Sequence, residues 1–305
     1  MAATQRDVRD RIDSVRNIQK ITRAMEMVAA ARLRRAEQRI EVLRPYARAI
    51  RRMTRQAAEA AGDLPKLPIL REHEQMNRVG LLLIAGDRGL AGAFNSNIVR
   101  AGTRAGREHE REGRTPVYFA SGRRPASSLT FRGLGVADSF TGFTDRPSYA
   151  DARRIAERLM AAYVDDEVDQ VEIFYNQYVS AMSQHVVGET LLPLQQASVL
   201  EEEDEEEDGG EGDERSERHA LVEYEPDPEE ILRRLVPDYV EVSIYRALLE
   251  STASEHGSRM TAMRNASDNA STLIDDLTLE MNRARQAEIT QEIMEVVAGA
   301  EGLSG

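Results

Sequence analysis

The sequence predicts an α/β protein in which a long helix at each end of the chain flanks a smaller α/β domain. Apolar and small residues recur every seven positions in the first sixty residues, and again after Pro237. Spacings of three and four that continue over several heptads form the pattern of a coiled-coil seam. We therefore expect an N-terminal coiled-coil helix at 1–60, an α/β domain at 61–236 and a C-terminal coiled-coil helix at 237–305.

The N-terminal repeat is longer than an ordinary globular helix. Its seven-residue series consists of Val8, Val15, Thr22, Ala29, Ala36, Leu43, Ile50 and Ala57. Ile18 and Met25 lie three positions after members of the series and are assigned to the same seam. A periodic pattern beyond about 25 residues indicates an extended helix. Pro45 interrupts the pattern, and we expect it to kink the helix or unwind it locally.

The middle of the chain alternates strand-like and helix-like segments. Continuous apolar or alternating runs predict strands at 78–85, 116–121, 168–179 and 185–192. Helical patterns lie at 95–112 and 148–164, and the glycine-rich stretch 122–147 is expected to be a loop. This alternation predicts a small sheet packed by helices, as in a Rossmann-like α/β domain.

An acidic block follows the last of these strands. Residues 201–219 hold twelve acidic residues against Arg215 and Arg218, a local charge of −10. Such a segment cannot bury apolar area, so we interpret it as a disordered insertion. A short strand at 221–224 and a short helix at 226–235 are expected to lead into the C-terminal helix.

The C-terminal helix carries its own seven-residue series. Its members are Val242, Leu249, His256, Met263, Ala270, Leu277 and Ala284. Pro237 suits the first turn of a helix, where its missing N–H has no intrahelical partner. Gly299 and Gly302 are expected to mark the helix end. Residues 1–60 carry a net charge of +8 and residues 238–298 a net charge of −6, which favours association of the two ends or a basic arm facing an acidic partner.

Enzyme, cofactor and metal chemistry find little support. The chain has no cysteine, and its five histidines lack metal-ligand spacing. The loop from Gly86 to Gly92 reads Gly-x-x-Gly-x-x-Gly, which differs from the dinucleotide fingerprint, and no Walker A lysine follows any glycine loop. We interpret this loop as a structural turn, and we expect no cofactor. A nucleotide-binding enzyme stays an alternative that ligand affinity of the isolated chain would support.

Two other classes of protein are weighed. Arg32, Arg34, Arg35 and Arg39 cluster within two helical turns, but no aromatic residues interleave them, so a partner-facing surface is favoured over nucleic-acid binding. A coiled-coil adaptor with a non-catalytic α/β domain would share the heptads and is the alternative function. No apolar run reaches the roughly 18 to 20 residues of a membrane span.

Four separated blocks resemble the gamma subunits of F-type ATP synthases of the bacterial type. They are Ile21–Ala30 with Arg44–Tyr46, Asp87–Asn95, Tyr224–Asp227, and Asn282–Glu295 with Gly299-Ala300. Gly302 departs from the family's C-terminal signature, and the acidic block 201–219 has no counterpart in the resemblance.

The resemblance implies a non-catalytic rotor shaft. Its terminal helices would form an antiparallel left-handed coiled coil inside the ring of alpha and beta subunits. The α/β domain would lie near the membrane and contact the epsilon subunit and the ring of c subunits. The location would be peripheral, at the cytoplasmic face of the bacterial plasma membrane.

The resemblance also suggests partner contacts. Those to the catalytic ring would be Arg23, Met25, Arg285, Gln286 and Thr290, joined by the apolar C-terminal residues Ile293, Val296 and Val297. Those to the membrane rotor ring would be Tyr224, Glu225 and Asp227.

Overall fold

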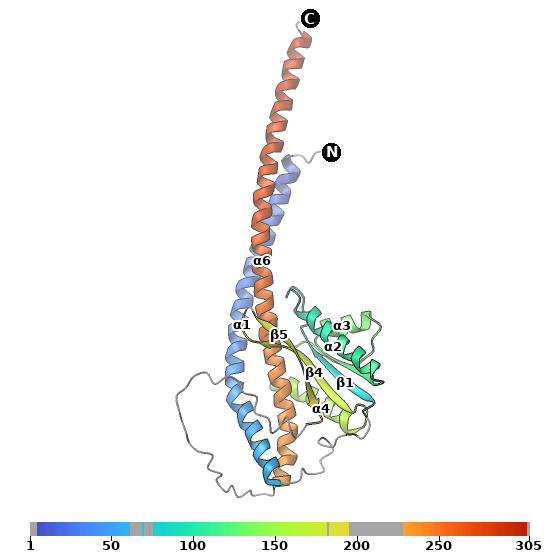
Figure 1. Cartoon of the computed structure of the whole chain (residues 1–305). Helices are drawn as coiled ribbons and strands as arrows, with labels where there is room; N and C mark the ends of the chain where they lie inside the picture. Colours follow the sequence, from blue (N-terminus) through green and yellow to red (C-terminus); the bar gives the residue numbers. More distant parts are fainter. Residues whose placement is uncertain are drawn as a thin grey trace. The chain divides into compact units, whose positions relative to one another are not determined.

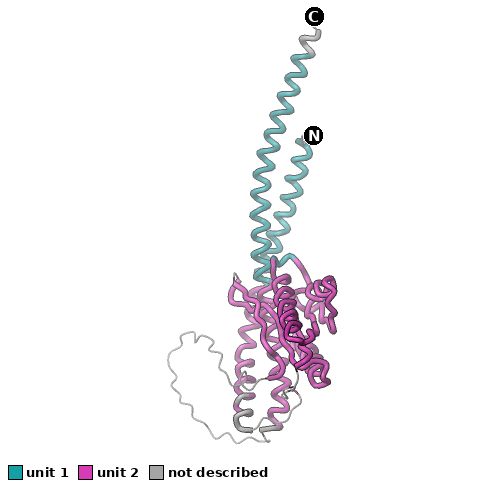
Figure 2. The backbone as a smooth tube through the Cα atoms, turned by 45° about the vertical axis from the view of Figure 1, so that its right-hand side comes forward, with its two compact units in different colours: residues 1–32, 90–92, 256–305 teal, residues 33–89, 93–255 magenta. Residues whose placement is uncertain are grey.

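The protein forms two compact units, which Figure 2 draws in different colours. The computed structural model describes residues 5–61, 69, 73, 76–181, 183–194 and 228–303. Unit 1 contains residues 1–32, 90–92 and 256–305, and unit 2 contains residues 33–89 and 93–255. The two long helices, α1 (Gln5–Ala61) and α6 (Pro228–Leu303), each contribute residues to both units.

Unit 1 is a pair of antiparallel helix segments that lie side by side (Figure 1). The Glu26 carboxylate accepts a bond from the Arg264 guanidinium at 2.9 Å, whereas Gln5 reaches Glu288 at the other end of the pair. The residue numbers rise along one helix and fall along the other, so the pairing is antiparallel, as expected. Val8, Ile12 and Leu277 form the buried seam, with Val15, Ile274 and Met281 packed against it.

Unit 2 contains a five-stranded sheet with the strand order β3-β2-β1-β4-β5. The strands are β1 (Arg78–Ile84), β2 (Thr115–Ser121), β3 (Val136–Phe140), β4 (Gln170–Tyr178) and β5 (Gln184–Leu192). The first four are parallel, and β5 pairs antiparallel with β4 at the edge. This is the Rossmann-like domain that the alternating pattern predicts.

Helices cover both faces of this sheet. On one face, Leu82 and Ile84 of β1 join a core with α4 (Tyr149–Val164) and the first part of α6. On the other face lies α2 (Phe94–Arg111), where Gly102 packs so closely that a Cβ would lie 2.7 Å from Leu83. Because successive side chains of a strand point to opposite faces of the sheet, the side chains of β1 contribute to two separate cores.

Most elements lie within a few residues of their predicted bounds, but the stretch 122–147 is not a loop. It contains α3 (Arg123–Phe131) and the edge strand β3. The helix is only 9 residues long, and the strand Val136–Phe140 has no fully buried side chain. Short elements with few buried apolar residues leave little periodic signal, which explains why the sequence pattern did not reveal them.

The C-terminal helix begins earlier than expected, because α6 already includes Pro228 and continues through Pro237. Leu232, Val236, Val240 and Ile244, spaced four apart on both sides of Pro237, belong to the main core. Each contributes about 1.5 to 3 kcal/mol on burial, which together exceeds the roughly 3 kcal/mol that an internal proline costs. Helix α6 continues past Gly299 but ends at Leu303, next to Gly302, and α1 continues through Pro45.

Candidate protein-interaction surface

The last part of α6 has no described α1 residue beside it. Helix α1 begins at Gln5, whose backbone N–H donates to Glu288 Oε1 at 3.2 Å. From Ile289 to Leu303, α6 extends about 22 Å further, at about 1.5 Å per residue. Every residue from Arg285 to Ala298 is exposed. The part of this exposed stretch that lies beyond Glu288, residues 289–298, is called the exposed end of α6 below.

The exposed end of α6 is apolar over much of its surface. Its exposed apolar side chains include Ile293 and Val296, which are 57% and 72% exposed. The other exposed apolar side chains of this segment are Ile289, Met294 and Val297. At about 100° per residue, Ile289 and Ile293 lie about 120° to 160° around the helix from the seam residue Leu277. They therefore form a second apolar face rather than a continuation of the α1 seam.

The remaining predicted contacts on α6 lie at the beginning of this segment or just before it. Arg285, Gln286 and Thr290 are all exposed. The Thr290 hydroxyl donates to the backbone carbonyl of Gln286 at 2.8 Å, so the helix itself satisfies its donor. Gln286, Thr290 and Ile293 follow one another at spacings of four and three and share one side of the helix.

Helix α1 carries a second apolar stripe beside its seam. Arg23 is exposed and Met25 is half-buried. Ile18, Ile21 and Val28 are 54%, 59% and 53% exposed, at spacings of three and seven. The assignment of Ile18 to the seam was therefore wrong. Thr22 and Ala29, which belong to the seven-residue series itself, are the buried seam residues in this part of the helix.

Several of these apolar residues were missed from the sequence. Ile289, Met294, Ile21 and Val28 are exposed large hydrophobics that sequence reasoning did not single out. Their signal is present as a second series at helical spacing, displaced around the helix from the seam. When a helix is compared with a single heptad pattern, such a series is either assigned to the seam or overlooked, because the pattern allows only one apolar face per helix.

The predicted membrane-ring contacts Tyr224, Glu225 and Asp227 lie outside the described residues, as do the acidic block 201–219 and the expected strand 221–224. Their placement therefore stays a prediction.

The glycine-containing loop after β1 is organised by Asp87. Its carboxylate accepts bonds from the backbone N–H groups of Arg123 and Gly142 at 3.0 and 2.8 Å, and from the Thr144 hydroxyl at 3.1 Å. These donors come from the start of α3 and from the segment after β3. A carboxylate in this position adds negative charge where a phosphate-binding loop would present N–H groups.

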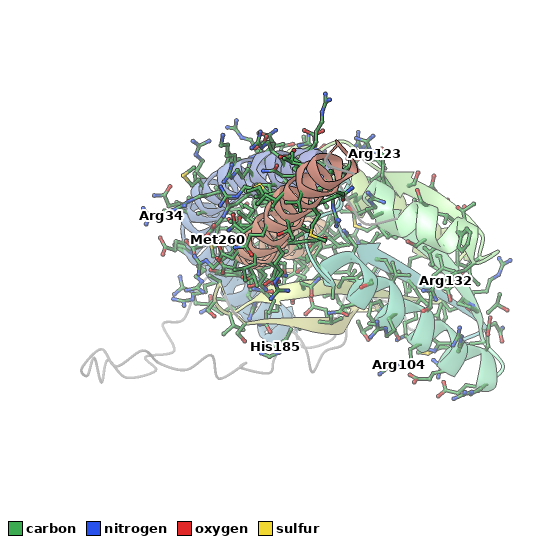
Figure 3. The ribbon with its side chains drawn as sticks, turned by 90° about the horizontal axis from the view of Figure 1, so that it is seen from above. Arg34, Arg104, Arg123, Arg132, His185 and Met260 are labelled. Carbon is green, nitrogen blue, oxygen red and sulfur yellow. The ribbon has the colours of Figure 1, made fainter. Side chains whose placement is uncertain are left out.

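A row of arginines marks the outer face of α2. Arg100, Arg104, Arg107 and Arg111 are exposed and recur at spacings of four, three and four, so they share one helix face. Figure 3 labels Arg104, together with Arg132 after α3. This charged surface was not singled out from the sequence, although its helical period was readable there.

A membrane-spanning helix and a metal site are both absent from the described part of the chain. No helix there is both long enough and apolar enough to cross a membrane. No group of three or more histidine, aspartate and glutamate side chains there is placed to hold a metal ion.

Comparisons with known proteins point to one family. A family model described as ATP synthase matches residues 4–303. The chain is 43% identical over 302 residues to the ATP synthase gamma chain of Rubrobacter xylanophilus, covering 99% of each protein. It is 42% identical over 308 residues to the ATP synthase gamma chain of Streptomyces coelicolor, covering 100% of this chain and 97% of that protein.

Solved structures share the fold. A chain from the central stalk and c-ring of the Tetrahymena thermophila mitochondrial ATP synthase matches with a TM-score of 0.59 and 27% identity, over 81% of this chain and 99% of that chain. A chain of the Euglena gracilis mitochondrial ATP synthase matches with a TM-score of 0.68, over 98% of this chain and 94% of that chain. At 20% identity, the second match is a likeness of fold.

Proposed function

The chain belongs to the family of ATP synthase gamma chains, and from that membership we propose that the exposed end of α6 is the surface through which it acts on the catalytic subunits. As a gamma chain, the protein is the non-catalytic rotor shaft of an F-type ATP synthase. It couples rotation driven by ion flow at the membrane to conformational change at the catalytic sites.

The observation that carries the proposal is an apolar helix end that the described residues of the chain leave uncovered. Ile293 and Val296 are exposed well beyond the point where Gln5 meets Glu288. A second protein that covers this end would remove the apolar area from water. Apolar contact is non-directional, so it suits a surface that must keep contact while it turns.

The asymmetry of the helix pair provides the physical coupling. A pair of helices has no threefold symmetry, so it presents a different face to each of three identical partners. A face that binds one conformation of a partner better than another shifts that partner toward the favoured conformation. Rotation of the pair would therefore impose different nucleotide affinities on the three catalytic sites in turn.

We assign the partner contacts on the same basis. The proposed contacts to the ring of alpha and beta subunits are Arg23, Met25, Arg285, Gln286, Thr290, Ile293, Val296 and Val297. The proposed contacts to the c-subunit ring are Tyr224, Glu225 and Asp227. Epsilon is a further proposed partner. Through these subunits the protein would be peripheral at the cytoplasmic face of a bacterial plasma membrane.

The domain division along the chain belongs to the same proposal. Segments 1–60 and 237–305 would act as the coiled-coil shaft, and segment 61–236 would act as the membrane-side domain. The acidic block 201–219 would be an insertion that the shaft function does not require.

Co-purification tests the proposal. The tagged full chain is co-expressed with the alpha, beta and epsilon subunits and purified through its tag. We expect the subunits to be recovered in fixed stoichiometry, with ATP hydrolysis by the complex. Recovery of the tagged chain alone, or only as a homo-oligomer, would instead support the free-standing adaptor.

A further inference from the structure

The sheet of unit 2 has a topological switch point between β1 and β4. From β1 the chain adds β2 and β3 on one side of the sheet, and then returns to add β4 on the other side. In open α/β sheets, ligands bind in the crevice outside the carboxyl ends of the strands at this point. In this protein, the position outside the carboxyl ends of β1 and β4 is occupied by another part of the same chain.

Helix α6 of the same chain occupies it. The Ser251 hydroxyl donates to the carbonyl of Ile84, the last residue of β1, at 3.3 Å. The Ser254 hydroxyl donates to the carbonyl of Asn176, near the carboxyl end of β4, at 3.1 Å. Both serines are buried, so these bonds are shielded from water.

A third hydroxyl extends the contact to the loop after β3. The Thr252 hydroxyl lies 2.9 Å from the carbonyl of Thr144 and 2.7 Å from the carbonyl of Leu248 on its own helix, so its single hydrogen is shared between the two acceptors. Thr144 is itself fixed, because its hydroxyl and its backbone N–H both contact the Asp87 carboxylate. The hydroxyls of Ser251, Thr252 and Ser254 thus bond to three separate backbone segments of the α/β domain. These three residues are called the hydroxyl clamp below.

Small residues allow this close approach. A Cβ added at Gly86 would lie 2.8 Å from the Glu255 carboxylate, so a larger residue there would collide with α6. Glu255 is itself buried, as is Ala253 on the same turn. A ligand in the crevice would have to displace the helix.

Helix α1 is tied to the same unit by polar contacts. The Tyr178 hydroxyl, at the end of β4, donates to the Glu37 carboxylate at 2.5 Å. Arg39 donates to the Tyr245 hydroxyl on α6 at 3.0 Å, and it also bonds the carbonyl of Pro147. Within unit 2, polar bonds therefore hold both long helices.

We propose that the hydroxyl clamp locks the part of α6 that belongs to unit 2 into the ligand crevice of the sheet, so that this part of the helix turns with the sheet as one rigid body. The inference rests on the proposed shaft function, because only a shaft transmits torque between its parts. Apolar packing resists separation but has no preferred direction, so it opposes sliding and rotation weakly. Hydrogen bonds lose strength steeply when their angles change, and a dry environment strengthens them. The bonds from Ser251 and Ser254, together with the shared bond from Thr252, therefore resist rotation of this part of α6 about its own axis.

A reversible crosslink tests the rigid-body part of the proposal. The chain has no cysteine, so Gly86→Cys with Glu255→Cys provides a unique pair. The added Cβ lies near the Glu255 carboxylate, and shortening that side chain makes room for the disulfide. The variant is assembled into the complex with cysteine-free partner subunits, and hydrolysis and pumping are compared before and after oxidation.

We expect the oxidised and reduced forms to agree within twofold in both activities. A loss of turnover on oxidation that reductant reverses would show that α6 moves against the sheet and would overturn the proposal. The variant Glu255→Cys alone, treated identically, controls for the oxidant.

Removing the hydroxyls tests the clamp itself. The variant Ser251→Ala/Thr252→Val/Ser254→Ala should lower the ratio of pumping to ATP hydrolysis at least twofold. Oxidation of the Gly86→Cys/Glu255→Cys pair in the same background should restore the ratio. The matched control is Thr278→Val, because the Thr278 hydroxyl bonds the Ile274 carbonyl within α6 itself.

An unchanged ratio in the triple variant would overturn the role of the clamp. If the triple variant fails to assemble, Ser254→Ala alone is measured against the same control. Failure of the unmodified chain to co-purify with its partners would count against the shaft function instead, so the two failures are distinguishable.

Discussion

The backbone N–H of Gln5 donates to the carboxylate of Glu288 at 3.2 Å, across 283 positions of sequence. This contact lies where α1 begins, and it fixes the register of the helix pair in unit 1. The seam residue Leu277 lies before Glu288 on α6 and is buried against α1, whereas Ile293 and Val296 lie beyond Glu288 and are exposed.

We expect substitution in the seam to destabilise unit 1. Ile12 is 3% exposed and packs with Leu277. Ile12→Ala should lower the free energy of unfolding by about 2 to 4 kcal/mol, because it removes buried methyl groups and leaves a cavity. Ile289→Ala, at a half-exposed position, is the control and should change it by less than about 1 kcal/mol. Denaturation of the isolated chain followed by circular dichroism gives both values, and equal effects would contradict the assignment of seam and surface.

Charges on the exposed end of α6 should weaken assembly without unfolding the chain. Ile293→Asp/Val296→Asp would place carboxylates on a face that we expect a partner to cover, where burial of an unpaired charge is costly. Affinity for the catalytic ring should fall at least tenfold in a binding titration, while the melting curve of the isolated chain stays unchanged. Phe131→Asp is the control, because Phe131 is also highly exposed but belongs to α3. An equal loss of affinity in the control would remove the exposed end of α6 as the specific contact.

Asp87 should contribute strongly to the stability of unit 2. Its side chain accepts bonds from Arg123, Gly142 and Thr144, which would all lose their acceptor in Asp87→Ala. Loss of bonds to a charged acceptor predicts a destabilisation of about 2 to 4 kcal/mol, measured by urea unfolding. Asp87→Asn keeps one carbonyl acceptor and should lose less. Equal losses in the two variants would show that the charge, which both of them remove, determines stability rather than the bonds.

The isolated chain should not bind ATP. The crevice at the carboxyl ends of β1 and β4 holds Ser251 and Ser254 of α6, and the Glu255 carboxylate lies against Gly86. A nucleotide would have to displace this buried helix and place its phosphates close to the Glu255 carboxylate. Calorimetric titration should therefore give no heat of binding at micromolar concentrations of chain. A micromolar dissociation constant would return the nucleotide-binding enzyme to consideration.

Deletion of residues 201–217 should leave assembly intact. The segment has no apolar residue with which to form a core, and its charge favours solvation. The shortened chain should co-purify with its partners in the same stoichiometry as the full chain. Failure to assemble would show that the acidic block makes a required contact, provided that circular dichroism still reports a folded chain.

The sequence predicted the long helices and most of the sheet because their signals are periodic and local. The heptad positions of Val8 and Leu277 identify the seam, and the continuous apolar run of β1 identifies a strand that is buried on both faces. The capping box of Ser148 and Asp151 likewise marks the start of α4 within the sequence itself. These features depend on neighbours a few residues away, which a sequence displays directly.

The tertiary structure alone decided which apolar residues are covered and what fills the crevice of the sheet. Ile18 and Ile293 are as apolar as Ile12, but their exposure depends on where the other helix lies and where it stops. Ser251 and Ser254 are unremarkable serines until the fold places them at the carbonyls of Ile84 and Asn176, far away in the sequence. Burial and hydrogen bonding between distant segments are properties of the packed chain, so a local pattern of residue types does not contain them.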